Sequence, residues 1–312
     1  MGKVILLGEP MALLIADTTG KLEDVEHFTR SMSGAEVNVA IGLSRLGHEV
    51  EYITKLGDDP FGHYIENKLK SNGIGTSFVM YDDVYKTGIQ LKNRVTDGSD
   101  PYAPYYRKGS AASHISIEDI DKINLDDVDL IHITGIPPAL SETARAATFH
   151  LAKKAKEKGI FITFDPNLRP NLWKSTEEMK TVINELSSYS NLILPGIAEC
   201  KILLDTEDKE KICEIYHNMG IDFVVIKNGS NGAYVSYKND IKIVDGFKVD
   251  KVVDTVGAGD GFAVGVISGY LEKLDIYDCA KRGNAIGAIQ VMNIGDNEGL
   301  PTPTELYNFM NR

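Results

Sequence analysis

Short apolar runs alternate with amphipathic helical segments along most of this chain, and this rhythm constrains the fold more than any other feature of the sequence. Strands that alternate with helices favour a parallel sheet covered by helices on both faces. We therefore predict a three-layer α/β (αβα) domain that spans residues 1–312, with ligands bound beyond the carboxyl ends of its strands. The predicted strands are Val4–Leu7, Val50–Leu56, Leu130–Thr134, Ile160–Asp165, Leu192–Pro195 and Phe223–Lys227.

The helical segments carry apolar residues at helical spacing, and several are followed by a glycine that suits a helix end. Near the C-terminus, Gly232–Tyr237 and Lys242–Asp245 are typical of a hairpin around Lys238–Asp240. The predicted helices are Ala35–Leu46, Pro60–Asn72, Glu142–Lys158, Thr176–Tyr189, Glu207–Met219, Ala258–Leu271, Ile276–Met292 and Thr304–Asn311.

Two stretches, at about 10–33 and 86–112, break this rhythm because neither shows a helical period. Both have alternating or strand-like composition, and the second contains the turn residues Asp97-Gly98-Ser99-Asp100. We predict a small β-sheet lid built from these two insertions, since lids exclude water from active sites. Ordinary surface hairpins are the alternative.

The charge and cysteine content narrow the classes of partner. The formal net charge of -12 disfavours nucleic acid and anionic membrane surfaces as main partners. The three cysteines, Cys200, Cys213 and Cys279, do not suggest a disulfide framework or a zinc site. No apolar run approaches the roughly 20 residues of a membrane span, and no signal peptide is evident, so we expect a cytoplasmic protein.

The segment Asp254–Gly265 (DTVGAGDGFAVG) is the most informative for chemistry. Its small residues Gly257, Ala258 and Gly259 lie where a helix begins, so backbone N–H groups and the helix dipole can hold an anion such as a transferring phosphoryl group. Asp260, beside them, can take a proton from an attacking hydroxyl. A tight turn with an Asp at a helix start is the alternative.

This segment resembles the C-terminal signature of the ribokinase-like (PfkB-type) carbohydrate kinases. Far upstream, Ser33–Ala40 (SGAEVNVA) resembles the N-terminal signature of the same family, with Ser33 where a second glycine is usual. The resemblance implies a ribokinase-like fold over the whole chain. It also implies that Gly34 and Asn38 hold substrate hydroxyls.

The resemblance further implies ATP and Mg²⁺ as cofactors. Glu199 matches the acidic position of the family's N-x-x-E motif, which organises Mg²⁺ through water, although Gly196 replaces the asparagine. The family's nucleotide-side positions match Lys227, Gly229, Gly232 and Asn284. Surface side chains and a helix-start carboxylate are the alternatives for these positions.

Two arginines favour an acidic sugar over a neutral one, since Arg suits carboxylates. The segments Tyr105–Ser113 (YYRKGSAAS) and Asp165–Pro170 (DPNLRP) resemble those of the 2-keto-3-deoxygluconate kinase subgroup. There, the residues matching Tyr105, Arg107 and Arg169 contact the sugar acid. Gln90 stands where that subgroup usually has another substrate-facing tyrosine. Structural ion pairs are the alternative for each arginine.

The leading hypothesis is a kinase that phosphorylates a sugar acid, most simply 2-keto-3-deoxygluconate at its 6-hydroxyl, with MgATP. A fructokinase or another neutral-sugar or nucleoside kinase of the same fold is the alternative, and a nucleotide-responsive binding protein is a third. A dinucleotide-dependent dehydrogenase is disfavoured because no G-x-G-x-x-G follows the first strand. The exposed strand edges of the predicted lid favour pairing with a second copy. Dimers formed through this lid are also common in the family that the chain resembles, so we expect a homodimer through the lid or a higher homo-oligomer.

Overall fold

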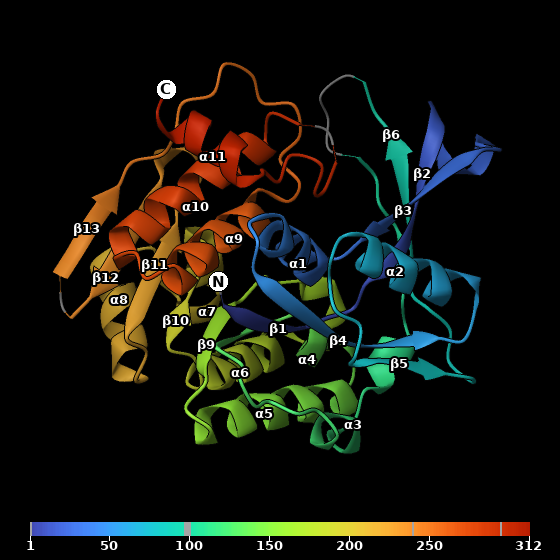
Figure 1. The fold of residues 1–312 in the computed structure, drawn as a ribbon, viewed down its shortest axis with the longest axis horizontal. Coiled ribbons are helices and arrows are strands. Elements are labelled where there is room, and N and C mark those ends of the chain that lie inside the picture. Colours follow the sequence, from blue (N-terminus) through green and yellow to red (C-terminus); the bar gives the residue numbers. More distant parts are fainter. Residues whose placement is uncertain (1, 97–100, 239, 294) are drawn as a thin grey trace.

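The computed structural model describes residues 2–96, 101–238, 240–293 and 295–312. Its larger sheet has nine strands in the order β13-β12-β11-β10-β9-β8-β1-β4-β5 (Figure 1). Neighbouring strands from β11 to β5 pair in parallel, and the hairpin β12–β13 closes one edge antiparallel. The strands are β1 (Lys3–Leu7), β4 (Glu49–Gly57), β5 (Val79–Asp82), β8 (Leu130–Thr134), β9 (Phe161–Asp165), β10 (Leu192–Ile193), β11 (Phe223–Lys227), β12 (Ala233–Tyr237) and β13 (Asp240–Val244).

Helices cover both faces of this sheet. The face with α1 and α9 carries α1 (Ala35–Arg45), α2 (Pro60–Ser71), α9 (Ala258–Leu271), α10 (Ile276–Gln290) and α11 (Pro303–Met310). The other face carries α3 (Ile117–Asp121), α5 (Glu142–Glu157), α6 (Thr176–Ser187), α7 (Ile197–Leu204) and α8 (Lys209–Asn218), with α4 (Pro137–Leu140) beside α5. Short 3₁₀ turns lie at Leu22–Asp24, Ala111–His114, Pro170–Leu172 and Gly229–Asn231.

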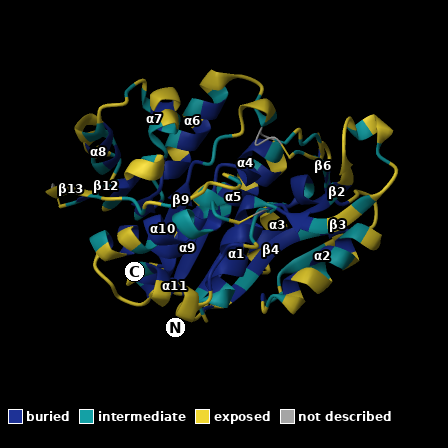
Figure 2. Ribbon diagram, turned by 90° about the horizontal axis from the view of Figure 1, so that it is seen from above, coloured by how far each residue is buried: buried dark blue, intermediate teal, exposed yellow. Residues whose placement is uncertain are grey.

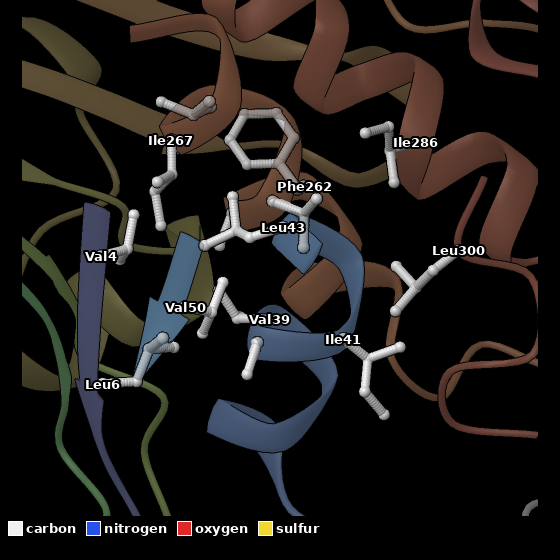
Figure 3. Close-up of a cluster of buried hydrophobic side chains, with 14 of the residues drawn as sticks. Val4, Leu6, Val39, Ile41, Leu43, Val50, Phe262, Ile267, Ile286 and Leu300 are labelled. Carbon is white, nitrogen blue, oxygen red and sulfur yellow. The ribbon is translucent and has the colours of Figure 1, made fainter. Parts of the chain in front are cut away.

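The alternation of side chains along each strand creates two hydrophobic cores. On β1, Val4 and Leu6 face the core around α1 and α9, whereas Ile5 and Leu7 face the core around α5 and α6. A strand buried on both faces must be apolar throughout, which is why β1 is a continuous hydrophobic run. Figure 3 shows the first core, where side chains of β1, β4, α1, α9 and α10 meet.

The smaller sheet stands apart from the larger one and has four strands in the order β3-β2-β6-β7. These are β2 (Met11–Thr19), β3 (Phe28–Ser33), β6 (Ile89–Arg94) and β7 (Tyr105–Tyr106), so all four come from the two predicted insertions. The parallel pairing of β2 with β6 joins the two segments. The predicted three-layer fold with a separate small sheet is confirmed, and the role of that sheet as a lid stays a prediction. The turn predicted at 97–100, and Asn239 in the predicted hairpin turn, lie outside the described residues.

Candidate active site

A cavity of about 470 Å³ opens where the parallel strands of the larger sheet end and the smaller sheet begins. Its wall contains residues that follow the ends of β1, β8, β9 and β10, together with the last residue of β11. This is the edge of an open α/β sheet at which ligands are expected to bind. Strand β6 and the segment after it contribute from the smaller sheet, and the start of α9 completes the wall. The segments are far apart in sequence, and only the fold brings them to one place.

Asp260 lies in this wall, in the first turn of α9, and its carboxylate is held on both sides. Asn38 Nδ2 of α1 donates to Oδ2 at 2.8 Å, and Asn167 Nδ2 donates to Oδ1 at 3.4 Å. Burial raises the pKa of Asp260 to about 6, with the hydrogen bond from Asn38 acting against that rise and Asp165 adding to it. A carboxylate with this pKa is mostly ionised at neutral pH and is basic enough to accept a proton from a hydroxyl.

The backbone beside Asp260 presents hydrogen-bond donors to the cavity. Gly257 precedes α9 in the left-handed conformation (φ 77°), and Gly257 and Gly259 both line the cavity. Among the described residues, no hydrogen-bond acceptor faces the N–H groups of Gly257, Gly259 or Asp260. Free N–H groups at a helix N-terminus can bind an anion, and these lie next to the carboxylate of Asp260.

Helix α9 is fixed in place by close contacts that only small residues permit. A Cβ on Gly265 would meet the backbone of Gly283 in α10, and a Cβ on Gly42 of α1 would meet Val264. Figure 2 shows α1, α9 and α10 buried over most of their length. The helix that carries Asp260 is therefore a rigid support, which is what an active-site base requires.

A lysine paired with a carboxylate also lines the cavity, close to the start of α9, since a Cβ on Gly259 would lie 3.9 Å from Lys227 Nζ. Lys227, the last residue of β11, contacts Asp165 Oδ2 at 2.7 Å, and Asp165 is the last residue of β9. Burial acts to lower the pKa of Lys227, but Asp165 and Glu199 outweigh it and raise that pKa. The lysine is therefore cationic and lies at the cavity wall near the anion site.

Glu199 also lines the cavity, and its carboxylate caps the N-terminus of α7. Its Oε2 accepts from Gly196 N at 2.7 Å, and its Oε1 accepts from Leu168 N at 2.9 Å. Over the described ranges, no group of three or more His, Cys, Asp or Glu side chains could hold a metal ion. The protein thus offers single carboxylates at the cavity and no complete metal cage among those residues.

Three of the residues predicted to bind a sugar, Gln90, Tyr105 and Arg107, line the cavity from the smaller sheet and the segment that leaves it. Arg107 is buried and paired with Glu9, while Tyr105 lies with its ring 5.6 Å from the Arg107 guanidinium carbon. Arg169 is exposed at the cavity rim and donates from Nη1 to its neighbour Leu168 O. Gln90 accepts from Ser33 Oγ at 2.6 Å.

A second carboxyl group, Glu36, lies fully buried between this region and the larger sheet. Thr134 Oγ1 donates to its Oε1, whereas Oε2 has no partner among the described residues. Burial raises the pKa of Glu36 to about 7. Tyr52 Oη is also without a partner there, and a Cβ on Gly8 would collide with both groups, so a glycine is required at that point.

The comparison with known families agrees with this geometry. The sequence model of the pfkB family carbohydrate kinases matches residues 1–303. This chain belongs to the PfkB family. The chain is an ATP-dependent sugar kinase. Free N–H groups beside a carboxylate are an arrangement that such a kinase can use for phosphoryl transfer.

Relatives with curated descriptions are similar to this PfkB kinase over its whole length. A 2-dehydro-3-deoxygluconokinase of Bacillus subtilis is 43% identical, with 98% of this chain and 94% of that protein covered. A 2-dehydro-3-deoxygluconokinase of Thermoproteus tenax is 34% identical, with 98% and 93% covered. A fructokinase of Vibrio alginolyticus is 27% identical, with 99% of each chain covered.

Solved structures give the same result for the fold. A PfkB protein from Polaromonas sp. has a TM-score of 0.90 at 42% identity, covering 98% of this chain and 99% of that one. A 2-dehydro-3-deoxygluconokinase of Thermotoga maritima has a TM-score of 0.90 at 25% identity, covering 100% and 98%. A sugar kinase of Pyrococcus horikoshii in complex with ATP has a TM-score of 0.82 at 26% identity, covering 99% of each. In the described part of the chain, no helix has the length and apolar character needed to cross a membrane.

Most of the residues predicted for this PfkB kinase from sequence meet in the one cavity. Those that line it are Gly34, Asn38, Gln90, Tyr105, Arg107, Arg169, Glu199, Lys227, Gly257, Gly259 and Asp260. Ala258, Gly229, Gly232 and Asn284 lie outside its wall. Asn284 Nδ2 donates to Val244 O and Asp245 O, which ties α10 to the end of β13 and the residue that follows it. Nucleotide contacts by these residues stay a prediction.

Several charged residues of the cavity were not singled out from the sequence. They are Glu9, Glu36, Lys92, Asp165 and Asp296. Lys92 of β6 reaches across to Asp296 at 3.1 Å, so it links the smaller sheet to the loop beside the anion site. Glu9 and Asp165 do carry a local signal, since each follows or ends a predicted buried strand, where ligand-binding side chains gather in α/β folds. Lys92 and Asp296 carry none, because their pairing spans 204 residues.

Proposed function

We propose that this kinase phosphorylates 2-keto-3-deoxygluconate at its 6-hydroxyl, using MgATP. The observation that carries the proposal is the meeting, in one cavity, of Asp260, the free N–H groups of Gly257 and Gly259, and two arginines, Arg107 and Arg169. The first three suit phosphoryl transfer to a hydroxyl, and the arginines suit an acceptor that carries a carboxylate. The 43% identical relative described as a 2-dehydro-3-deoxygluconokinase supports the same substrate.

In the proposed reaction, Asp260 accepts the proton of the 6-hydroxyl as that oxygen attacks the γ-phosphorus of ATP. A new O–P bond forms, the bond from the γ-phosphorus to the bridging oxygen breaks, and ADP leaves. The N–H groups at the start of α9 donate to the phosphoryl oxygens, which carry the negative charge of the transition state. Asn38 holds Asp260 so that its carboxylate faces the cavity.

Mg²⁺ belongs to this proposal because it neutralises charge on the β- and γ-phosphates. The residues present fit a metal ion held mainly by phosphates and water, since Glu199 and Asp165 are single carboxylates that already accept hydrogen bonds. We assign Glu199 an indirect role, through a water molecule. Lys227 is placed to approach a phosphate once ATP is bound.

The substrate proposal is tested with a panel of acceptors and ATP, following ADP formation and locating the phosphate on the product by NMR. The panel contains 2-keto-3-deoxygluconate, gluconate, D-fructose, D-ribose and a nucleoside. We expect the highest kcat/KM for the keto-deoxy acid. Faster phosphorylation of D-fructose would instead support the fructokinase alternative. The residue that favours this alternative is Gln90, which stands where the 2-keto-3-deoxygluconate kinase subgroup usually has a tyrosine. Assembly through the small sheet stays a prediction, which light scattering of the purified protein can test.

A further inference from the structure

The buried carboxylate of Glu9 holds Arg107 by one edge of its guanidinium group. Arg107 Nε donates to Glu9 Oε2 at 2.6 Å, and Nη2 contacts the same oxygen. The exposed fraction of the side chain is 1% for Glu9 and 8% for Arg107. No described residue accepts from Nη1, although Arg107 lines the cavity. The edge that faces away from Glu9 is therefore the one left for a ligand.

Other contacts fix Glu9 itself. Ser110 Oγ donates to Oε1, and Ser110 N donates to Arg107 O at 3.1 Å, so Glu9 and Arg107 share a third partner. A Cβ on Gly88 would come within 2.9 Å of Glu9 Oε1, and the absence of a side chain there admits the carboxylate. The ring of Tyr105 lies beside the guanidinium group. Arg107 is thus confined at its edge by a charge and on one side by an aromatic ring.

The pair of Glu9 and Arg107 also connects the larger sheet to the smaller one. Glu9 lies in the short connection from β1 of the larger sheet to β2 of the smaller sheet. Arg107 and Ser110 lie where the chain leaves β7 of the smaller sheet. The chain passes between the two sheets four times, and the pair joins the first of these passages to the last, at the wall of the cavity.

We propose that Glu9 is a positioning residue for the acceptor, which fixes Arg107 so that Nη1 donates to the carboxylate end of the sugar acid. A long arginine side chain has many rotamers, and holding it in one of them in advance removes an entropic cost from substrate binding. The inference rests on the proposed function, because it takes the acceptor to be an acid. Glu9 acts through Arg107 and takes no part in the transfer of the phosphoryl group.

The test is a double-mutant cycle of Glu9→Gln, Arg107→Met and the double variant, measured with the best acidic acceptor of the panel. Glu9→Gln should raise KM for the acid about 10- to 100-fold, the range for a hydrogen bond to a charged group, with little change in kcat or in KM for ATP. In the Arg107→Met background the same change should have almost no further effect, because the group that Glu9 positions is gone. The KM for D-fructose should change less than the KM for the acid.

Two more variants distinguish a loss of positioning from a loss of folding. Ser110→Ala removes the other partner of Glu9 and should raise KM for the acid in the same direction by a smaller factor. Glu23→Gln changes an exposed carboxylate in the first insertion, away from the cavity wall, and should leave all constants unchanged. An effect of Glu9→Gln that persists in full without Arg107, or that appears equally in KM for ATP, would overturn the inference. Absence of activity on every sugar acid would instead refute the proposed substrate, and the cycle can still be measured with the acceptor that is used.

Discussion

Replacement of Asp260 by Asn tests the catalytic base and its electrostatic environment in one protein. The substitution keeps the shape and an acceptor for Asn38 Nδ2, but it removes the charge. Burial raises the pKa of Asp260 from an ordinary 3.8 to about 6, which corresponds to at most about 3 kcal/mol of unfavourable free energy for the ionised form in the folded chain. We therefore expect an enzyme that is nearly inactive and more stable.

The sign of the effect follows from proton binding. Between pH 3.8 and about 6 the folded chain keeps a proton on Asp260 that the unfolded chain has released, so the contribution of this group to stability falls as the pH rises. The Asn variant lacks this titration. Its advantage in the free energy of unfolding should be near zero at pH 4 and should grow to at most about 3 kcal/mol above pH 7.

The assay is urea denaturation of both proteins at pH 4.5, 5.5, 6.5 and 7.5, together with steady-state kinetics. The loss in kcat should be about 10²- to 10⁴-fold, as for a general base, and kcat/KM of the unmodified kinase should fall as the pH drops below about 6. An advantage in stability that does not change with pH would refute the electrostatic reasoning. A kcat close to that of the unmodified protein would refute the role of Asp260 as the base.

Three further predictions concern other parts of the cavity. Arg169→Ala should raise KM for a sugar acid about 10- to 100-fold, because a charged hydrogen bond is lost, and should leave KM for D-fructose nearly unchanged in the same ADP-release assay. Gly257→Ala should abolish most of kcat while the protein stays folded by circular dichroism, since residue 257 has a φ of 77° and a Cβ there would collide with Asp296 O. Glu36→Gln should raise the melting temperature at pH 8 and leave it unchanged near pH 4, because burial raises the pKa of Glu36 to about 7.

The fold was predictable where local pattern and global structure agree. The bounds of β8, β11 and α9 match the predicted ranges, because each is an apolar run that a parallel sheet or a buried helix requires. The edge strand β5 was not predicted, since its residues are at most partly buried and carry no alternation. Helix α7 was not predicted either, because it has only eight residues and follows Pro195-Gly196, which indicate a turn.

The site was predictable only in part. A sequence motif indicates the role of one continuous segment, whereas much of the site consists of ion pairs between residues that are far apart in sequence. The glycine-rich segment around Asp260 indicates an anion site by itself. The pairing of Arg107 with Glu9 spans 98 residues and follows from the way the smaller sheet returns to the larger one. The composition and periodicity of the sequence do not indicate which residues pair over such a separation. Arg107 could therefore be predicted from the sequence, but its partner Glu9 could be identified only in the structure.

The pairings explain how an acidic protein can bind two anions in one cavity. The chain has a net charge of -12, and three cations of the cavity are each matched by a carboxylate: Lys92 by Asp296, Arg107 by Glu9 and Lys227 by Asp165. Such pairs hold a cation in place for a directed hydrogen bond but offset part of its charge, so the uncompensated positive charge of the cavity comes from groups without a carboxylate partner. Among the described residues these are Arg169 and the N–H groups at the start of α9. Arg169 is exposed at the cavity and the N–H groups lie beside Asp260. If Arg169 binds the acid as proposed, its removal should weaken binding of the acid while the N–H groups at the start of α9 remain.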